Sequence, residues 1–143
     1  MTWTGSCMCS NIKYKVDLPA DIEPPKLTLC HCTTCKHYTG SAFSANFCVP
    51  KDKHSFTQGT PKVYYGDTDH GRKIKRQFCG DCGSPLTSEP GHLVGKILVK
   101  AGTLDADHKL RIGGVGHEIY HHRKDRWVHD VGCDHVTRVD GEI

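Results

Sequence analysis

Cysteine spacing constrains this chain more than any other feature of its sequence. Seven of its nine cysteines fall into three short groups, which are Cys7 with Cys9, Cys30 with Cys32 and Cys35, and Cys79 with Cys82. In a reducing compartment, thiols one or two residues apart more often bind a metal than form disulfides. An odd number of cysteines also cannot pair completely within one chain. We therefore expect zinc sites and a fold built around them.

The composition agrees with a small domain that needs a metal for its stability. The chain has 143 residues, of which 36% are hydrophobic and 8% aromatic, a low content for a domain held together by packing alone. We expect one domain over residues 1–143. The polar tail, residues 138–143, is expected to be frayed.

Charge and hydropathy argue against several classes of function. The net charge is +3 with the histidines neutral, and no run of five or six like charges occurs, which disfavours a nucleic-acid partner. No apolar run approaches the roughly 18 residues needed to cross a bilayer. The N-terminus also lacks the charged and apolar regions of a secretory signal. We expect a cytoplasmic protein without a membrane partner.

Short strand-like segments alternate with turns along the chain. Proline and glycine recur every ten to fifteen residues, and no window of ten residues has helical periodicity. Strand character occurs at residues 11–16, 42–49, 61–65, 73–78 and 93–101, while residues 33–40 could form a turn or two of helix. The pattern predicts a mostly β domain in which residues 93–101, the most apolar segment, form a central strand.

Cys79 and Cys82 have the spacing of a zinc knuckle. Two residues separate the thiols, and Gly80 and Gly83 let the backbone turn tightly enough to direct both sulfurs at one ion. Redox motifs share this spacing, so a thiol redox protein that uses this pair is one alternative. A tetrahedral zinc site needs two further ligands from elsewhere in the chain.

Cys7 and Cys9 are the pair that most economically completes this site. One residue separates them, so in an extended strand their side chains would point to opposite faces. They can share a metal only if the backbone bends, and we expect Gly5 to allow the bend. Taking two ligands from residues 30–35 instead would split that group. The assignment is thus a closed structural zinc site of Cys7, Cys9, Cys79 and Cys82.

Cys30, Cys32 and Cys35 remain as a local group of three without an obvious fourth cysteine. Three protein ligands and an open position are typical of a zinc ion that takes part in chemistry. Three thiolates give Zn²⁺ a net charge of −1, and this soft site suits an incoming thiol better than water. We infer binding, activation or release of a thiolate, with two Zn²⁺ per chain in all.

A second structural zinc is the alternative for this group, with its fourth ligand from a distant histidine or from Cys48. Cys48 lies in an apolar stretch and is expected to be a buried small hydrophobe. His31 is expected to orient the loop or face solvent rather than bind the same metal. Cys133 is expected to be an unpaired thiol near the tail.

The cysteine groups and their neighbours resemble a known family. Residues 5–9, 30–35 and 78–84, with further matches at 101–105 and 117–127, are similar to those of the glutathione-dependent formaldehyde-activating enzymes and the related centromere protein V domains. The resemblance implies a β-tent (Mss-four-like) fold of short antiparallel sheets with two zinc sites. It also implies a structural four-cysteine site and a catalytic zinc at Cys30, Cys32 and Cys35.

The resemblance implies a zinc-dependent carbon–sulfur lyase, since the type activity of the family joins formaldehyde to glutathione. The expected partner is a small-molecule thiol or a glutathione adduct such as S-hydroxymethylglutathione, its sulfur held at the open zinc. Glutathione is anionic, and basic residues lie near the metal-binding segments in sequence: Lys36, His37, Arg72, Lys73, Lys75 and Arg76. Three further side chains could line a cleft, namely His117, Tyr120 and Trp127, although a tryptophan more often lies in a core. The centromere-protein relatives suggest the other alternative, a zinc-stabilised binding module for protein or nucleic acid.

Overall fold

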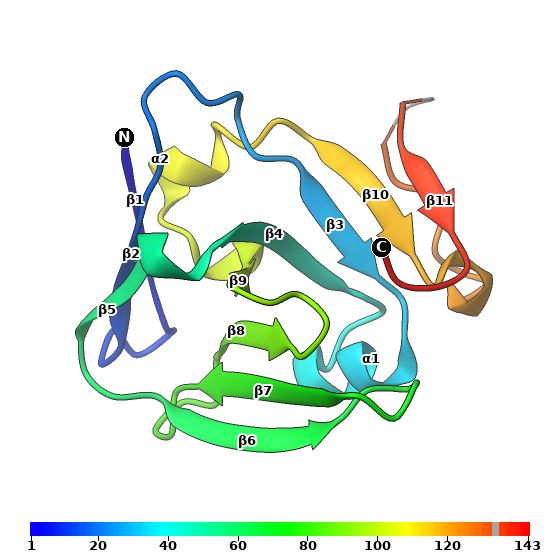
Figure 1. Cartoon of the computed structure of the whole chain (residues 1–143), viewed down its shortest axis with the longest axis horizontal. Coiled ribbons are helices and arrows are strands. Elements are labelled where there is room, and N and C mark those ends of the chain that lie inside the picture. The colour runs from blue at the N-terminus through cyan, green and yellow to red at the C-terminus, as the bar shows by residue number, and fades with distance from the viewer. Residues whose placement is uncertain (133–134) are drawn as a thin grey trace.

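Short strands form two β-sheets in the computed structural model, which describes residues 1–132 and 135–143 (Figure 1). The smaller sheet has the order β1-β2-β5, with β1 (Thr2–Ser6), β2 (Lys13–Asp17) and β5 (His54–Gln58). The larger sheet has the order β11-β10-β3-β4-β9-β8-β7-β6. Its strands are β3 (Leu27–Cys30), β4 (Ser44–Pro50), β6 (Lys62–Asp67), β7 (Lys73–Phe78), β8 (Pro85–Pro90), β9 (Lys96–Lys100), β10 (Val115–Ile119) and β11 (Thr137–Val139).

The helices are short and lie in the connections. They are α1 (Thr33–Thr39), α2 (Ala106–Lys109) and the 3₁₀ turns η1 (Lys51–Lys53), η2 (Ala101–Thr103) and η3 (His121–Arg123). None of the helices among the described residues is long and apolar enough to span a membrane. The mostly β prediction is confirmed, and β9 lies in the interior of the larger sheet as expected.

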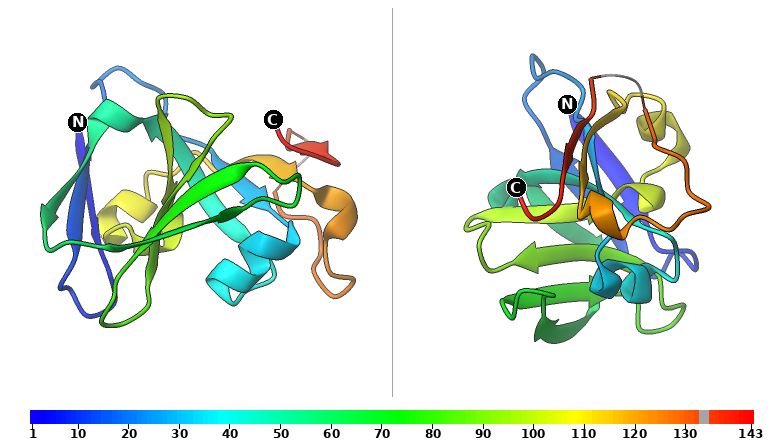
Figure 2. Two further views of the ribbon diagram at one scale, coloured as in Figure 1. Left: turned by 60° about the horizontal axis from the view of Figure 1, so that its bottom comes forward. Right: turned by 90° about the vertical axis from the view of Figure 1, so that its right-hand side faces the viewer.

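Strand β10 departs from the expected antiparallel pairing. It pairs in parallel with both β3 and β11, whereas the other strand pairs are antiparallel. Parallel neighbours need a crossover connection, and residues 101–114, which contain η2 and α2, return the chain from β9 to β10. Part of the tail expected to be frayed thus forms β11 beside β10 (Figure 2). Cys133 lies outside the described residues.

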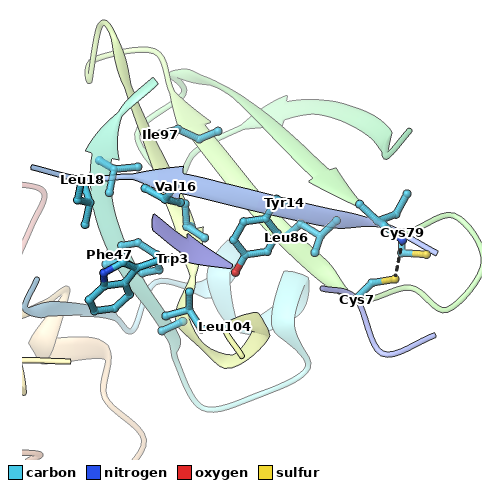
Figure 3. Close-up of a cluster of buried hydrophobic side chains, with 14 residues drawn as sticks. Trp3, Cys7, Tyr14, Val16, Leu18, Phe47, Cys79, Leu86, Ile97 and Leu104 are labelled. Carbon is cyan, nitrogen blue, oxygen red and sulfur yellow. Dashed lines mark hydrogen bonds between the residues drawn. The ribbon is translucent and has the colours of Figure 1, made fainter. Parts of the chain in front are cut away.

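The main core lies where the two sheets meet. Its largest fully buried side chains include Trp3 and Tyr14 from the smaller sheet and Phe47 and Leu86 from the larger one (Figure 3). Burial of side chains of this size stabilises the fold by roughly 1.5–3 kcal/mol each. Cys7 and Cys79 belong to this same cluster, whereas Cys30 and Cys32 belong to a separate small cluster with Tyr120.

Candidate metal centres and the adjoining cavity

Four cysteines from two hairpin turns converge at the edge of the main core. Cys7 and Cys9 follow β1, while Cys79 and Cys82 lie between β7 and β8, and all four sulfurs lie within 4.8 Å of one another. The Cys7 and Cys9 sulfurs are 3.5 Å apart, and those of Cys9 and Cys79 are 3.7 Å apart. Ligand sulfurs in a tetrahedral zinc site are about 3.8 Å apart, given Zn–S bonds of about 2.3 Å. These two separations match such a site, so the cluster could hold Zn²⁺.

The bend that brings Cys7 and Cys9 together lies after the strand, which differs from our expectation for Gly5. Gly5 is inside β1, paired with Tyr14, and a Cβ there would lie 2.4 Å from the Tyr14 hydroxyl oxygen. Glycine is needed there for close packing rather than for a turn. The turn itself is closed by hydrogen bonds from the Ser10 N–H to the Cys7 carbonyl and from the Cys7 N–H to the Ile12 carbonyl.

Hydrogen bonds close the turn that carries Cys79 and Cys82 and join it to the turn that carries Cys7 and Cys9. The Gly83 N–H donates to the Cys79 carbonyl at 2.9 Å, and Gly83 has a φ of 75°, a left-handed conformation that glycine adopts easily. The Ser84 hydroxyl accepts from the Met8 N–H at 3.0 Å and lies 3.2 Å from the Cys82 sulfur. The side-chain and backbone hydrogen bonds of Ser84 lower the pKa of Cys82 to about 5. The thiolate is the form in which a cysteine binds a metal.

Three further cysteines converge where β3 ends and α1 begins. The sulfurs of Cys30, Cys32 and Cys35 lie within 4.8 Å of one another. Cys32 caps α1, and its sulfur accepts a hydrogen bond from the Cys35 N–H at 3.3 Å and lies 3.3 Å from the Thr34 hydroxyl. Hydrogen bonds with Cys30 and Cys35 lower the pKa of Cys32, whereas hydrogen bonds with Cys32 and Cys35 raise the pKa of Cys30. Among the described residues, the three sulfurs have no fourth cysteine, histidine or carboxylate within 4.8 Å of all of them.

His31 lies between two of these cysteines and is completely buried. Its Nε2 lies 3.1 Å from Oε1 of Glu118, which is itself fully buried, and Arg138 Nε donates to the other Glu118 oxygen at 2.8 Å. The backbone N–H of His31 also donates to the Ile119 carbonyl. Of the two roles expected for His31, the structure thus supports orientation of the loop and contradicts exposure to solvent. The partners Glu118 and Arg138 were not predicted.

Glu118, His121 and Asp130 also converge, and Glu118 contacts His31. Their carboxylates already pair with cations, since Arg138 contacts Glu118 and both Arg138 and Lys124 contact Asp130. A divalent cation here would face two positive charges. This group acts as an ion-pair network that anchors η3 and β11.

A cavity of about 520 Å³ adjoins the three-cysteine cluster and does not reach the four-cysteine cluster. Its walls come mainly from one face of the larger sheet. They include the side chains Cys30, Cys32, Cys35, Cys48, Arg76, Lys100, His117 and Tyr120. Ligand pockets for small molecules have volumes of roughly 300–1,000 Å³, so the cavity has room for a small substrate.

Cys48 and Trp127 differ from their expected positions. Cys48 is exposed rather than buried, because its neighbours Phe47 and Val49 point into the core and strand alternation turns Cys48 to the cavity face. Trp127 is 72% exposed and is neither a core residue nor part of the cavity wall. His117 and Tyr120, which were expected to line a cleft, both line the cavity.

Most of the basic residues considered as anion contacts form ion pairs instead. Lys36 pairs with Asp125, Arg72 with Glu142, Lys73 with Asp67 and Lys75 with Glu89. Exposed pairs of this kind contribute little to stability, and their charge is already balanced. Two members of the set form no ion pair among the described residues. His37 is exposed on α1 and does not line the cavity, whereas Arg76 is buried at 5% exposure on the cavity wall.

Lys100 is a second buried cation on this wall, and sequence reasoning missed it. Its Nζ donates to the Ser44 hydroxyl at 2.9 Å and to the Asn46 side-chain oxygen at 2.6 Å. Burial lowers the pKa of Lys100 to about 8, although the electrostatic influence of Cys35 and Cys30 opposes the shift. The sequence feature that could have indicated this buried cation is the position of the lysine at the end of the most apolar segment.

A C-terminal residue lies at the edge of the cavity. Glu142 accepts a hydrogen bond from the Tyr120 hydroxyl at 3.2 Å and pairs with Arg72 at 3.1 Å and with His92 at 3.5 Å. These contacts tie the end of the chain to β10 on one side and to the β6–β7 and β8–β9 connections on the other. The carboxylate of Glu142 is therefore already neutralised.

Known proteins share this fold and part of this sequence. A protein of Schizosaccharomyces pombe (strain 972 / ATCC 24843) named an uncharacterized lyase is 36% identical over 84 residues, which are 59% of this chain and 55% of that protein. The chain thus spans about half the length of this curated relative. The crystal structure of a Rhodobacter sphaeroides protein is similar, with a TM-score of 0.56 and 18% identity over 72% of this chain and 88% of that one, a likeness of fold.

The family assignment rests on nearly the whole chain. Residues 2–123 match the family model for the glutathione-dependent formaldehyde-activating enzyme. This stretch contains both cysteine clusters and all the strands of the two sheets except β11. The chain belongs to the family of glutathione-dependent formaldehyde-activating enzymes.

Proposed function

We propose that this protein is a zinc-dependent carbon–sulfur lyase that acts on a small thiol adduct, such as S-hydroxymethylglutathione, at the three-cysteine cluster. One observation carries the proposal: three convergent thiols form part of a cavity wall, without a fourth protein ligand among the described residues. The family match over residues 2–123 and the naming of the S. pombe relative as a lyase support this class of reaction.

The two clusters would then hold two Zn²⁺ ions with different roles. Cys7, Cys9, Cys79 and Cys82 would complete a structural site, while Cys30, Cys32 and Cys35 would leave one coordination position for the substrate. When bound at the second cluster, zinc supplies a soft Lewis acid that favours the thiolate form of a sulfur ligand. The hydrogen bonds of Thr34 and the Cys35 N–H to Cys32 keep that ligand as a thiolate.

The chain must also handle one proton. Cleavage of R–S–CH₂–OH to a thiolate and formaldehyde breaks the C–S bond, leaves the electron pair on sulfur and removes the hydroxyl proton. Two histidines line the cavity among the described residues, and His92 is paired with Glu142 at 3.5 Å. We assign the proton to the half-buried imidazole of His117, the residue type most often used for such transfers.

The cavity also favours an enzyme over a binding module. Its volume of about 520 Å³ suits a small molecule, whereas a partner protein or nucleic acid would use an extended surface. The redox alternative is disfavoured by the close approach of Cys79 and Cys82 to two other sulfurs, because thiolates that bind zinc cannot cycle through a disulfide.

The test replaces Cys32 by serine and measures release of formaldehyde from S-hydroxymethylglutathione, with the zinc content and the circular dichroism spectrum as checks on metal and fold. We expect loss of one zinc per chain and of turnover, with the fold retained. Cys48→Ser is the matched control, because Cys48 lines the same cavity outside the cluster. Wild-type turnover by a Cys32→Ser protein that has lost this zinc would contradict the proposal.

A further inference from the structure

Two buried cations near the three-cysteine cluster have no carboxylate partner among the described residues. Lys100 and Arg76 are each 5% exposed and come from different strands, β9 and β7. Both lie close to the Tyr38 ring on α1, with Lys100 Nζ 5.2 Å and the Arg76 guanidinium carbon 5.3 Å from its centre. Both also line the cavity that contains the three cysteines.

Their polar contacts leave both charges unbalanced. Lys100 Nζ donates only to neutral oxygens, those of Ser44 and Asn46. Arg76 Nε is buried and contacts no acceptor in the described part of the chain, cysteine sulfurs included. The two side-chain carboxylates on the cavity wall among the described residues are engaged elsewhere, since Asp69 pairs with Arg123 and Glu142 with Arg72.

Buried charges and buried donors without partners are costly, and proteins retain them where a ligand supplies the partner. The zinc site proposed above would carry a net charge of −1, which balances one of the two cations. The other charge, and the unpartnered Arg76 Nε, call for a second anion inside the cavity. A guanidinium matches a planar carboxylate, because its N–H groups fit the two oxygens.

We propose that Lys100 and Arg76 form a subsite for a carboxylate of the substrate, so that the enzyme selects small thiols that carry a carboxylate over neutral thiols. The inference rests on the proposed function, because the thiol sulfur is taken to lie at the three-cysteine cluster. The two cations act as specificity-determining residues, while the cluster provides affinity for the sulfur.

The test compares two thiols of similar size on the zinc-loaded protein by isothermal titration calorimetry. The thiols are 3-mercaptopropionate and its neutral analogue 3-mercapto-1-propanol. We expect wild-type protein to bind the carboxylate about 10- to 100-fold more tightly, the range for hydrogen bonds between charged groups. We expect Lys100→Met and Arg76→Gln each to remove most of this preference without changing the affinity for the neutral thiol.

Lys96→Met is the matched control, because Lys96 is an exposed lysine on the same strand and also lines the cavity. It should keep the preference for the carboxylate. The wild-type comparison and Arg76→Gln, on another strand, keep the test decisive if Lys100→Met does not fold.

The outcomes separate the subsite from the function on which it rests. Equal affinity of wild-type protein for the two thiols overturns the subsite and leaves the proposed function standing. An equal loss of affinity for both thiols in the variants also overturns the subsite, because the cations would then act on the sulfur. Failure of both thiols to bind overturns the proposed function, and the subsite with it.

Discussion

The two cysteine clusters use the same ligand chemistry but have different surroundings. The four-cysteine cluster joins turns that are far apart in sequence and is continuous with the main core through Cys7 and Cys79. The three-cysteine cluster lies within six residues, belongs to a small separate cluster and faces a cavity. The comparison teaches that the number of cysteines and the space beside them, rather than the residue type, distinguish the two clusters. In the proposed function, this difference separates a structural zinc site from one that a substrate can reach.

The largest expected effect comes from breaking the four-cysteine cluster. Cys79 is completely buried, and we expect Cys79→Ser to lose one zinc and most of the folding free energy, because a structural zinc supplies folding energy directly. Urea denaturation and metal analysis of the purified protein would measure both effects. Cys48→Ser, on an exposed cysteine, should change neither quantity. A Cys79→Ser protein with the wild-type urea midpoint would remove the distinction between the clusters.

Removing a ligand from the other cluster should have a smaller effect on stability. We expect Cys35→Ser to lose one zinc and to lower the free energy of unfolding by about 1–3 kcal/mol, a range typical of single substitutions, because the main core does not include this cluster. The same urea titration measures this decrease in the free energy of unfolding. If Cys35→Ser unfolds as readily as Cys79→Ser, both clusters are structural.

A third effect should follow from weakening the buried contacts that Glu118 makes with His31 and Arg138 next to the three-cysteine cluster. Glu118→Gln weakens the buried contacts of Glu118 with His31 and Arg138, and we expect a loss of about 1–3 kcal/mol together with faster loss of one zinc to a chelator. The faster loss of zinc is expected because His31 lies between Cys30 and Cys32 in the sequence. Glu89→Gln is the control, a carboxylate paired with Lys51 and Lys75. Identical rates of zinc loss in both variants would show that His31 does not position the cluster.

The last effect, which is absent at neutral pH, concerns the sheet that carries the Cys7 turn. His54 in β5 packs against Tyr14, and burial lowers its pKa to about 4 despite the opposing charge of Glu89. Its pKa in the unfolded chain is about 6.5, so the unfolded state binds more protons between about pH 4 and pH 6.5. This contribution to stability is complete above about pH 6.5 and is lost as the pH falls through that window.

The test for His54 is the urea midpoint of metal-loaded protein at about pH 7 and about pH 4.5. His54→Gln should show a smaller decrease between the two pH values than wild type. Zinc loss in acid affects both proteins alike, so the difference between them reports on His54. Parallel decreases in the two proteins would assign the acid sensitivity to the cysteines alone.

The sequence predicted the parts of the fold that have a clear local pattern. The strand segments expected at 11–16, 42–49, 61–65, 73–78 and 93–101 correspond to β2, β4, β6, β7 and β9, and residues 33–39 form α1. Strand β8 was missed because it begins and ends with proline and buries Thr87 and Ser88. Strand β10 was missed because it contains Gly116 and a buried Glu118, whose partners come from distant segments.

For the site, counting and spacing predicted the membership of both clusters, and the geometry agrees with that grouping. The surroundings could not be predicted in the same way. Alternation along β4 places Cys48 and Phe47 on opposite faces, but it does not say which face is the core. In the sequence, Lys100 looks like the polar end of an apolar strand. Only the fold shows that Lys100 and Arg76 of β7 both lie over the ring of Tyr38 on α1.

The sequence separation of the ligands also sets an order of assembly. Residues 10–78 lie between the two halves of the four-cysteine cluster, whereas residues 30–35 contain all of the other one. Closing the longer loop costs about 2 kcal/mol more chain entropy, by the logarithmic dependence on loop length. During synthesis, Cys30, Cys32 and Cys35 can meet a metal ion as soon as they emerge, while Cys7 and Cys9 must wait for the β7–β8 turn. With two zinc ions bound as proposed, the cluster that faces the cavity can thus be loaded before the four-cysteine cluster is complete.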